Sequence, residues 1–473
     1  TVTVKRADEK ETSKTWSFTI GEATFQRYFG QLHSHTQYSD GAGSLESALA
    51  YIKALPDSAN VDFVAFTDHS NYFDKSGAAN PEGALYDMSL ASAASQNLWN
   101  EYKNAVAAFN TENAGSMVAI AGFEMTWSGG PGHINTFNTP GIVSRNNTTL
   151  NNKTKDAGLQ AYYKLLSQTE GVDSISQFNH PGTTFGNFID FGYWDAVVDT
   201  RMYMVEVGNG EGQIGAGGYY PSYEQYIMAL DKGWHVAPTN NQDNHKGLWG
   251  DANTARSVVL VDSLTQENIY DAMRNYRVYA TEDNDLSIYY TLDGYIMGSI
   301  LEDGATGDTV HLSVDLSDPT DASIGKVQVI TNGGLVLAEK NVSGNEETVT
   351  FDVKNDYSYY YIKVVEADSD IAVTAPVWVG SVEAAGIDSF STDEVLPVKG
   401  EPLTVNLGLY NNENSELAID SITFEVGGET VHEADLAAAG LGSVASMSTG
   451  SYSFDYTYDG VGSMETVSYT HLR

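Results

Sequence analysis

The sequence has 473 residues, a formal net charge of −39 and no cysteine. This charge repels nucleic acid phosphates and anionic membrane surfaces, so we expect no nucleic acid scaffold among its partners. The absence of cysteine excludes disulfides, thiolate metal sites and cysteine nucleophiles. No apolar run reaches the roughly 18 residues of a membrane span, and the hydrophobic content of 41% suits globular domains.

The first half of the chain predicts an α/β fold. Residues 1–24 alternate apolar and polar positions and predict an N-terminal β segment. Residues 25–285 alternate apolar runs with helical stretches, which favours a parallel sheet or barrel. The expected strands are Val61–Phe66, Met117–Phe123, Ile175–Phe178, Met202–Val207, Trp234–Ala237 and Val258–Val261. The expected helices are Ser44–Leu55, Leu90–Phe109, Gly158–Gln168, Tyr223–Lys232 and Thr265–Arg274.

The helical pattern ends near residue 285, and the rest of the chain predicts all-β domains. Residues 286–380 contain alternating segments separated by Gly, Asp and Asn turns, which is typical of a β-sandwich. Residues 381–473 repeat this pattern and predict a second, Ig-like β-sandwich, with truncation at its C-terminal end left open. Such domains suit attachment to a cell surface. Few lysines, 29 tyrosines and 45 glycines favour a secreted or cell-surface bacterial protein.

Histidines and carboxylates follow the apolar runs of residues 25–285 at several places. In Gln31-Leu-His33-Ser-His35 the histidines are two residues apart, so in a strand both face the same side. Asp40 follows at a turn that Gly41 permits. The later candidates are His69, Glu124, His133, His180, Asp243 and His245. Because barrel active sites lie at the carboxyl ends of the strands, these nine residues predict one common site.

The chemistry of these nine side chains indicates a metal centre. Neutral imidazole and carboxylate ligands suit Zn²⁺, Mn²⁺ or Fe²⁺. Nine ligands are too many for one ion at roughly four to five each, so we expect two or three divalent metal ions as cofactors. Histidines scattered over a surface would not follow one apolar run after another in this way.

The ordered motifs resemble those of the PHP (polymerase and histidinol phosphatase) family of metallohydrolases, and more narrowly its CehA/McbA-type branch. The resemblance covers roughly residues 25–290. It is carried by His33-X-His35, Asp40, Thr67-Asp68-His69, Gly122-Phe-Glu124, His133, Asn179-His180-Pro and Asp243-X-His245, and by Tyr279-Ala-Thr-Glu-Asp-Asn284-Asp for the branch. It implies a distorted (β/α)7 TIM-like barrel with a trinuclear site at the carboxyl ends of its strands.

The resemblance also implies which side chains share an ion. One ion would take His33, His35, Glu124 and Asp243, a second Asp40, His69 and His245, and a third His133, His180 and the bridging Glu124. Asp40 departs from family members that have histidine there, which puts the preference of the second ion in doubt. We expect Asp68 to orient its neighbour rather than to bind metal.

The expected activity is metal-dependent hydrolysis of a phosphomonoester or phosphodiester in a small-molecule or polymeric substrate. Clustered divalent ions lower the pKa of a bound water, supply hydroxide at neutral pH and neutralise charge on phosphoryl oxygens. We expect Asp243 and His245 to act at the reacting centre and Arg256 to clamp the phosphate. Lys246 is a further cation near the motif. A structural salt bridge is the alternative for both basic residues.

Two other functions stay open. The same centre could hydrolyse carbamate, ester or amide bonds, and an apolar pocket with few basic residues would favour that reaction. The chain could instead be a cell-surface binding protein with an inactive barrel, although nine competent ligands argue against it. We expect Trp249 near the site, and His235, inside an apolar run, in the core or beside a ligand.

Overall fold

The computed structural model describes most of the chain. The described residues are 2–5, 11–14, 25–74, 93–147, 150, 155–168, 173–302, 304–379, 385–392, 400–411, 416–426, 429–445, 448–457 and 466–472. Within the β segment predicted at residues 1–24, β1 (Val2–Lys5) pairs antiparallel with β2 (Glu11–Lys14). The rest of that segment lies outside the described residues.

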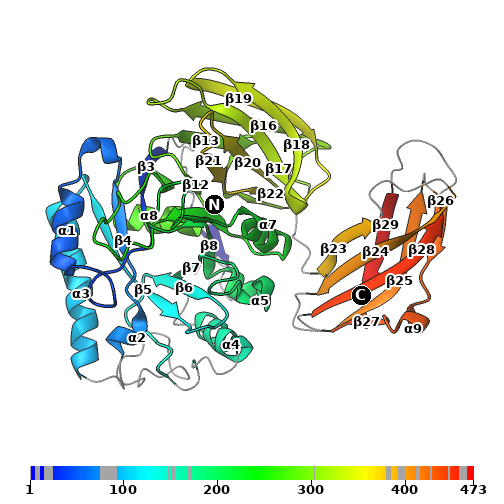
Figure 1. Cartoon of the computed structure of the whole chain (residues 1–473), viewed down its shortest axis with the longest axis horizontal. Helices are drawn as coiled ribbons and strands as arrows, with labels where there is room; N and C mark the ends of the chain where they lie inside the picture. The colour runs from blue at the N-terminus through cyan, green and yellow to red at the C-terminus, as the bar shows by residue number, and fades with distance from the viewer. Residues whose placement is uncertain are drawn as a thin grey trace.

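One mixed sheet of 16 strands organises the chain from residue 26 to residue 379 (Figure 1). Its main path follows the order β10 (Ala237–Asn241), β8 (Met202–Asn209), β7 (Ile175–Asn179), β6 (His133–Phe137), β5 (Val118–Thr126), β4 (Phe63–Phe66), β3 (Gln26–Gln31), β11 (Arg256–Val261), β12 (Val278–Thr281), β21 (Ile371–Thr374), β20 (Tyr359–Val365), β17 (Gly325–Thr331) and β18 (Leu335–Val342). The short strands β9 (Tyr220–Pro221), β15 (Ile300–Leu301) and β22 (Val377–Val379) pair beside this path.

The part of this sheet from β10 to β12 is curled. Asn240 at its edge donates hydrogen bonds to Ser257 in β11 and to the backbone carbonyl of Thr281 in β12. Strands β4, β8, β10 and β11 are buried along their whole length, which explains apolar runs without alternation. We call the curled part of the sheet from β10 to β12 the half-barrel.

Few helices cover the half-barrel. They are α1 (Leu45–Lys53), α2 (Ser70–Phe73), α3 (Ala93–Glu112), α4 (Lys155–Leu166), α5 (Phe188–Phe191), α6 (Ala196–Asp199), α7 (Tyr223–Asp231) and α8 (Gln266–Arg274). The side chains of Ser44 and Thr265 accept hydrogen bonds from the backbone N–H groups of Ser47 and Asn268. These bonds cap α1 and α8, so the predicted starts of both helices are confirmed. The predicted start of α3 at Leu90 lies outside the described residues.

Strict strand–helix alternation is interrupted at β6. The pairs β3–β4, β4–β5, β7–β8 and β8–β10 are parallel, as expected, but β6 is antiparallel to both β5 and β7. It follows β5 without a helix, because Gly129 and Gly132 adopt φ of +69° and +151° and let the chain reverse. The observed fold is therefore a mixed, curled sheet, and the exact (β/α)7 barrel is not confirmed.

Residues 287–379 form a second β module that shares a core with the half-barrel. Its free sheet contains β14 (Tyr295–Ile296), β13 (Ser287–Leu292), β16 (Thr309–Ser317) and β19 (Glu346–Lys354). Its other sheet continues that of the half-barrel, because β12 pairs antiparallel with β21. One hydrophobic cluster contains buried side chains on both sides of residue 285. The predicted boundary at 285/286 therefore does not divide two cores.

Residues 385–472 form a C-terminal β module with its own core (Figure 1, orange to red). Its elements are β23 (Ala385–Thr392), β24 (Pro402–Asn411), β25 (Leu417–Val426), β26 (Glu429–Glu433), α9 (Leu436–Ala439), β27 (Ser443–Val444), β28 (Ser448–Thr457) and β29 (Thr466–Leu472). Leu403, Leu407, Ile422 and Phe424 belong to this second hydrophobic cluster. Across the described residues, no helix has the length and apolar character needed to cross a membrane.

Trp378 in β22 ties the second β module to the half-barrel. Its fully buried ring lies 5.0 Å from the ring of His235 and 5.2 Å from that of Tyr276, measured between centroids. We predict that Trp378→Ala lowers the free energy of unfolding by about 3–5 kcal/mol. Denaturant titration followed by circular dichroism measures this loss. The control Tyr295→Ala, at a side chain 43% exposed, should change it by less than about 0.5 kcal/mol. Equal effects of the two substitutions would contradict a shared core.

Candidate metal centre

Two histidines that follow β3 meet a carboxylate from the loop after β10. His33 and His35 are fully buried, and their Nε2 atoms lie 3.2 Å apart. Asp243 Oδ1 lies 3.1 Å from Nε2 of His33 and 3.0 Å from Nε2 of His35. Three potential ligand atoms therefore converge on one point.

Glu124, near the end of β5, lies at the centre of the site. Its Oε1 is 3.5 Å from His33 Nε2, 3.2 Å from His133 Nδ1 and 3.4 Å from His180 Nε2. Its Oε2 is 2.5 Å from Nδ1 of His69. Glu124 thus lies between four histidines, and the bridging role that the resemblance implies for it stays a prediction.

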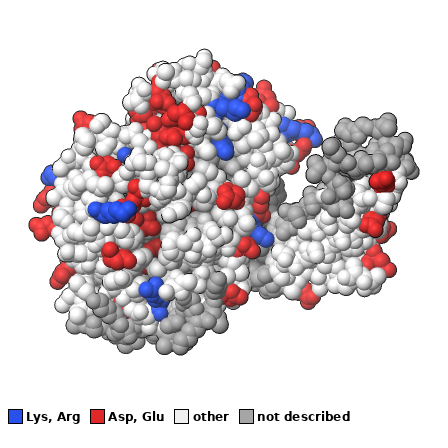
Figure 2. All heavy atoms as spheres, viewed as in Figure 1, with Lys and Arg blue, Asp and Glu red and all other residues white. Residues whose placement is uncertain are grey.

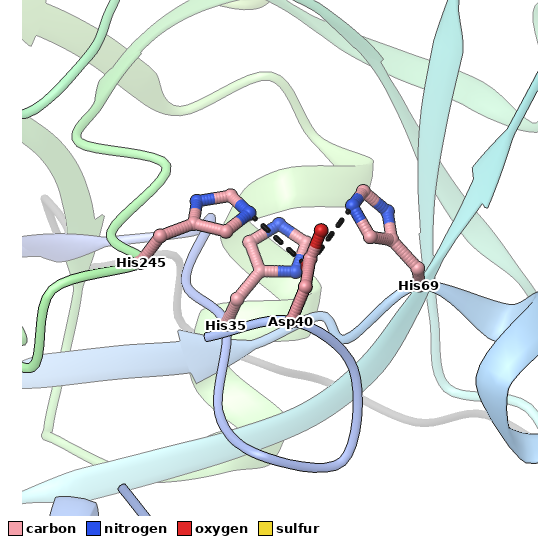
Figure 3. Close-up of side chains that lie close together, drawn as sticks. All are labelled: His35, Asp40, His69 and His245. Atoms are coloured by element: carbon pink, nitrogen blue, oxygen red, sulfur yellow. Dashed lines mark ion pairs between the residues drawn. The ribbon is translucent and has the colours of Figure 1, made fainter. Parts of the chain in front are cut away.

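The solvent side of the site is formed by Asp40, His69 and His245 (Figure 3). Asp40 Oδ1 lies 3.4 Å from Nε2 of both His69 and His245. The ring of His35 stacks on that of His245 with centroids 4.1 Å apart. The Asp40 side chain is 46% exposed, whereas those of His33, His35 and Glu124 are buried. The site therefore has an open side and a buried floor.

All nine predicted ligands meet at this place, in overlapping groups whose ligand atoms lie within 4.8 Å of one another. The groups are His35, Asp40, His69 and His245; His33, His180 and Asp243; His33, His35 and Glu124; and Glu124, His133 and His180. The second and third predicted ligand sets recur, with His35 added to the second. The first predicted set is divided between two groups. That these residues bind metal stays a prediction.

Backbone carbonyl groups fix the orientation of two of the histidine rings. His245 Nδ1 lies 2.7 Å from the backbone carbonyl of Asp243, and His133 Nε2 lies 3.3 Å from that of Trp127. A carbonyl only accepts, so we assign the ring proton to these two nitrogens. In the neutral form of each ring the other nitrogen carries a lone pair, which points into the site.

His35 is oriented through a relay to Asp68. The Ser39 hydroxyl donates to Asp68 Oδ1 at 2.6 Å, which leaves its oxygen to accept from His35 Nδ1 at 3.1 Å. Asp68 also accepts from the backbone N–H and the hydroxyl of Thr36. The expectation that Asp68 orients its neighbour His69 is thus replaced: Asp68 holds the loop that carries Asp40, and through Ser39 it orients His35.

Glu206 is a functional residue that the sequence motifs did not reveal. It is fully buried in β8 and accepts from His33 Nδ1 at 2.9 Å. It also accepts from Gln177 Nε2, the backbone N–H of His180, Asn209 Nδ2 and Asn241 Nδ2. Glu206 thus holds the His33 ring in one orientation, and as the acceptor it keeps the proton of His33 on Nδ1. The one signal in the sequence is an acid inside the apolar run Met202–Val207.

The electrostatics of the site demand positive charge. Burial acts to lower the pKa of His33, but Asp243, Glu206 and Glu124 outweigh it and raise the pKa to about 10. The pKa of His245 is raised to about 9 despite burial, through Asp40 and Asp243. The hydrogen bond to His245 lowers the pKa of Asp40 to about 2. Protons on these histidines supply the charge that divalent ions would otherwise supply.

The donor set fits divalent ions on two further observations. Asp243 Oδ1 and His180 Nδ1 are buried without a well-aligned hydrogen bond. Both residues also have positive φ, +47° for Asp243 and +30° for His180. Such backbone strain costs about 1–3 kcal/mol per residue and persists where surrounding structure enforces it. The chemistry of imidazole and carboxylate donors suits Zn²⁺, Mn²⁺ or Fe²⁺.

The predicted phosphate clamp at Arg256 is wrong. The Arg256 side chain is 1% exposed and donates to the backbone carbonyls of Ala59, Asn60, Asn253 and Ala255. Its guanidinium therefore joins two loops of the half-barrel and has no free edge for a bidentate phosphate contact.

Trp249 and His235 have supporting roles. Trp249 Nε1 donates to the backbone carbonyl of His35 at 2.8 Å, so this residue supports the site from behind. His235 is outside the nine-residue site. Its Nδ1 lies 2.7 Å from Asp199 Oδ2, and its ring packs against Trp378 in the core.

A cavity of about 910 Å³ opens from His180, Asp243 and His245. Its walls are the loops 180–187 and 209–222. Phe185 in the first loop is 45% exposed and lies 4.8 Å from the ring of His180. Among the described lining residues, Lys246 is the one lysine or arginine, and its Nζ lies 3.9 Å from Glu211 Oε2. The lining is therefore glycine-rich and combines polar with apolar surface, and it carries little positive charge.

Comparisons with known proteins give distant likenesses. No protein-family model matches the sequence. The chain is 23% identical over 235 residues to the plasma membrane-type calcium-transporting ATPase 3 of Oryza sativa subsp. japonica, a match that covers 50% of this chain and 19% of that protein. The chain thus spans about a fifth of the length of this curated relative.

Two solved structures are similar in part. One is a two-domain protein containing a predicted PHP-like metal-dependent phosphoesterase from Bacteroides vulgatus ATCC 8482, with 15% identity, a TM-score of 0.37, and 77% of this chain and 100% of that chain covered. The other is red sea bream transglutaminase, with 10% identity, a TM-score of 0.17, and 56% and 42% covered. At these TM-scores neither likeness carries an argument about function.

Glu206→Gln tests how the site is oriented. The amide keeps the shape of the side chain but sets an NH₂ donor against N–H groups that meet a carboxylate oxygen in the wild type. The hydrogen bond that fixes the tautomer of His33 is therefore weakened or lost. We predict that metal affinity falls by about 10- to 100-fold. Competition with a chromogenic chelator measures this fall. Glu224→Gln, an exposed residue of the cavity wall, is the matched control, and an equal loss in both variants would contradict the role of Glu206.

Proposed function

We propose that this protein is a metal-dependent hydrolase that cleaves phosphate esters. The observation that carries the proposal is the convergence of nine ligand-type side chains into overlapping groups, in which backbone carbonyls orient the rings of His133 and His245. An inactive barrel that serves only for cell-surface binding would need neither the complete donor set nor this orientation.

The chain itself supplies the binding and positioning. Divalent ions bound here would lower the pKa of a coordinated water and neutralise charge on the phosphoryl oxygens. His33, His35 and Glu124 form the buried floor, while Asp40 and His245 face solvent. Asp243 and His245, like His180, line both the site and the cavity, which supports the proposal that they contact the substrate.

The finer assignments belong to the same proposal. The ordered motifs support membership of the PHP family and of its CehA/McbA-type branch, and with it a mixed sheet derived from a (β/α)7 barrel. The donor chemistry supports two or three ions of Zn²⁺, Mn²⁺ or Fe²⁺. Export and attachment through the β modules are supported by composition alone.

A second candidate function is hydrolysis of carbamate, ester or amide bonds. The observation that favours it is the shortage of cations around the cavity. Lys246 is paired with Glu211, and Arg256 is engaged by backbone carbonyls. A neutral carbonyl substrate needs no such cations, because the same activated water can attack a carbonyl carbon.

Removal of metal or of one ligand should abolish hydrolysis. We predict two or three equivalents of a divalent transition metal by elemental analysis, and turnover of an aryl phosphate that a chelator stops. Asp243→Asn and Glu124→Gln should each lower kcat/KM by about 100-fold or more, since several kcal/mol of charge stabilisation are lost. Asp308→Asn, on the exposed surface, is the control. A chain that binds no metal after reconstitution would contradict the proposal.

Paired substrates separate the two candidate functions. For an aryl phosphate, Lys246→Ala should raise KM by about 2- to 5-fold, the effect of one exposed charge, and leave kcat unchanged. A neutral aryl ester or carbamate should show no change. Both substrates are measured with the wild type and with the variant. Faster turnover of the neutral substrate would make the carbonyl hydrolase the correct assignment.

A further inference from the structure

A second group of carboxylates lies outside the metal centre, where the half-barrel meets the second β module. Asp283 and Asp285 follow β12, and Asp318 follows β16. Ligand oxygens of these three residues lie within 4.8 Å of one another. Figure 2 shows Asp and Glu side chains gathered on the upper part of the molecule, close to the position of β13 in Figure 1.

Glu366, which follows β20, gives an independent observation. Its side chain is 4% exposed, and no N–H or O–H group of the described residues donates to either of its carboxyl oxygens. Asp318 is fully buried, and its Oδ2 likewise accepts from none of them. The Glu366 carboxyl lies within hydrogen-bonding reach of the Asp318 side chain, so the buried side chain faces the group. Buried carboxylates without donors are unfavourable unless a cation or a proton compensates them.

Each carboxylate of the group makes ionisation of its neighbours less favourable. Burial, followed by Asp318 and Asp283, raises the pKa of Glu366 to about 11. Burial and the neighbouring Asp283 raise the pKa of Asp285 to about 7. The named neighbours that act on Glu366 are all acidic. The fold thus assembles negative charge from three separate segments without a basic partner among those neighbours.

Backbone donors already hold two of the carboxylates in place. Asp318 Oδ1 accepts from the backbone N–H groups of Thr320 at 3.2 Å and Asp321 at 2.9 Å. Asp283 Oδ1 accepts from those of Asp285 at 2.6 Å and Leu286 at 2.8 Å. These bonds fix each side chain by one oxygen, and for Asp318 they leave the other oxygen for a ligand.

We propose that Asp283, Asp285, Asp318 and Glu366 bind a calcium ion. The donors are carboxylate oxygens only, which suits a hard cation rather than the ions that favour imidazole. Ca²⁺ accepts about six to eight oxygens in flexible geometry, whereas Mg²⁺ requires a near-octahedral set. The bound ion would join the loop after β12 in the half-barrel to two loops of the second β module.

Calorimetric titration of the full chain with CaCl₂, after treatment with EGTA, tests the proposal. We expect saturable binding of a single equivalent in the micromolar to millimolar range and a higher Tm with calcium than without it. Glu366→Gln and Asp318→Asn should each weaken binding by about tenfold or more and remove the rise in Tm. Glu347→Gln, the same change on the exposed face of β19, should leave both unchanged.

Loss of calcium binding in these variants with the metal centre still loaded supports the assignment. If one variant does not fold, the other decides, with Asp285→Asn as a third substitution at a less buried position. Absence of calcium binding in the wild type overturns the proposal and leaves Glu366 as a protonated acid. Binding that all the substitutions leave intact also overturns it.

Discussion

The buried carboxylate of Glu124 is the constraint on which the metal centre depends. It is 1% exposed and lies within 3.5 Å of ligand nitrogens from four histidines. Burial acts to raise its pKa, but His69, His133 and His33 hold that pKa well below the usual range. An ionised carboxylate at this depth is stable only with positive charge around it. The histidines must therefore either carry protons or share cations with Glu124.

The mixed sheet explains how four histidines reach one carboxylate. Parallel pairing with β4 brings His69 beside Glu124 through an isolated bridge. Antiparallel pairing with β6 places His133 opposite Thr126, two residues along the strand. A helix in place of the Gly129–Gly132 turn would move His133 away from this position. The interruption of strand–helix alternation at β6 is thus part of the construction of the site.

The sequence reveals the residues whose role depends on local pattern. His33 and His35 lie two residues apart just after β3, most of the later ligands end or follow apolar runs, and Ser44 and Thr265 start helices by bonds to residues three positions on. Each of these features depends on neighbours within a few residues. Local pattern was therefore enough to find the nine side chains that the fold brings together and most of the half-barrel strands and helices, whereas metal binding by these residues stays a prediction.

Residues whose role depends on distant partners escaped prediction. Arg256 lies near a motif in sequence, but carbonyls from Ala59 and Asn60, almost 200 residues away, engage its guanidinium. Glu206 collects donors from three other segments of the chain, which contribute His33, Gln177 with His180, and Asn241. The strand β6 is short and half polar, so no apolar run marks it. Contacts of this range are set by topology, which periodicity does not encode.

The two groups of buried charge differ in the donors they offer, and this difference separates the cations each can hold. The metal centre combines imidazole nitrogens with carboxylates, whereas the group around Glu366 offers oxygen alone. They are also connected through the protein. Glu282, beside Asp283, accepts from the hydroxyls of Tyr219 and Tyr223 and from the backbone N–H of Ile371. Those tyrosines flank residues of the cavity wall. A cation that fixes Asp283 would therefore also hold Glu282 and, through it, Tyr219 and Tyr223. In this way a cation bound between the half-barrel and the second β module would influence the shape of the cavity in front of the candidate metal centre.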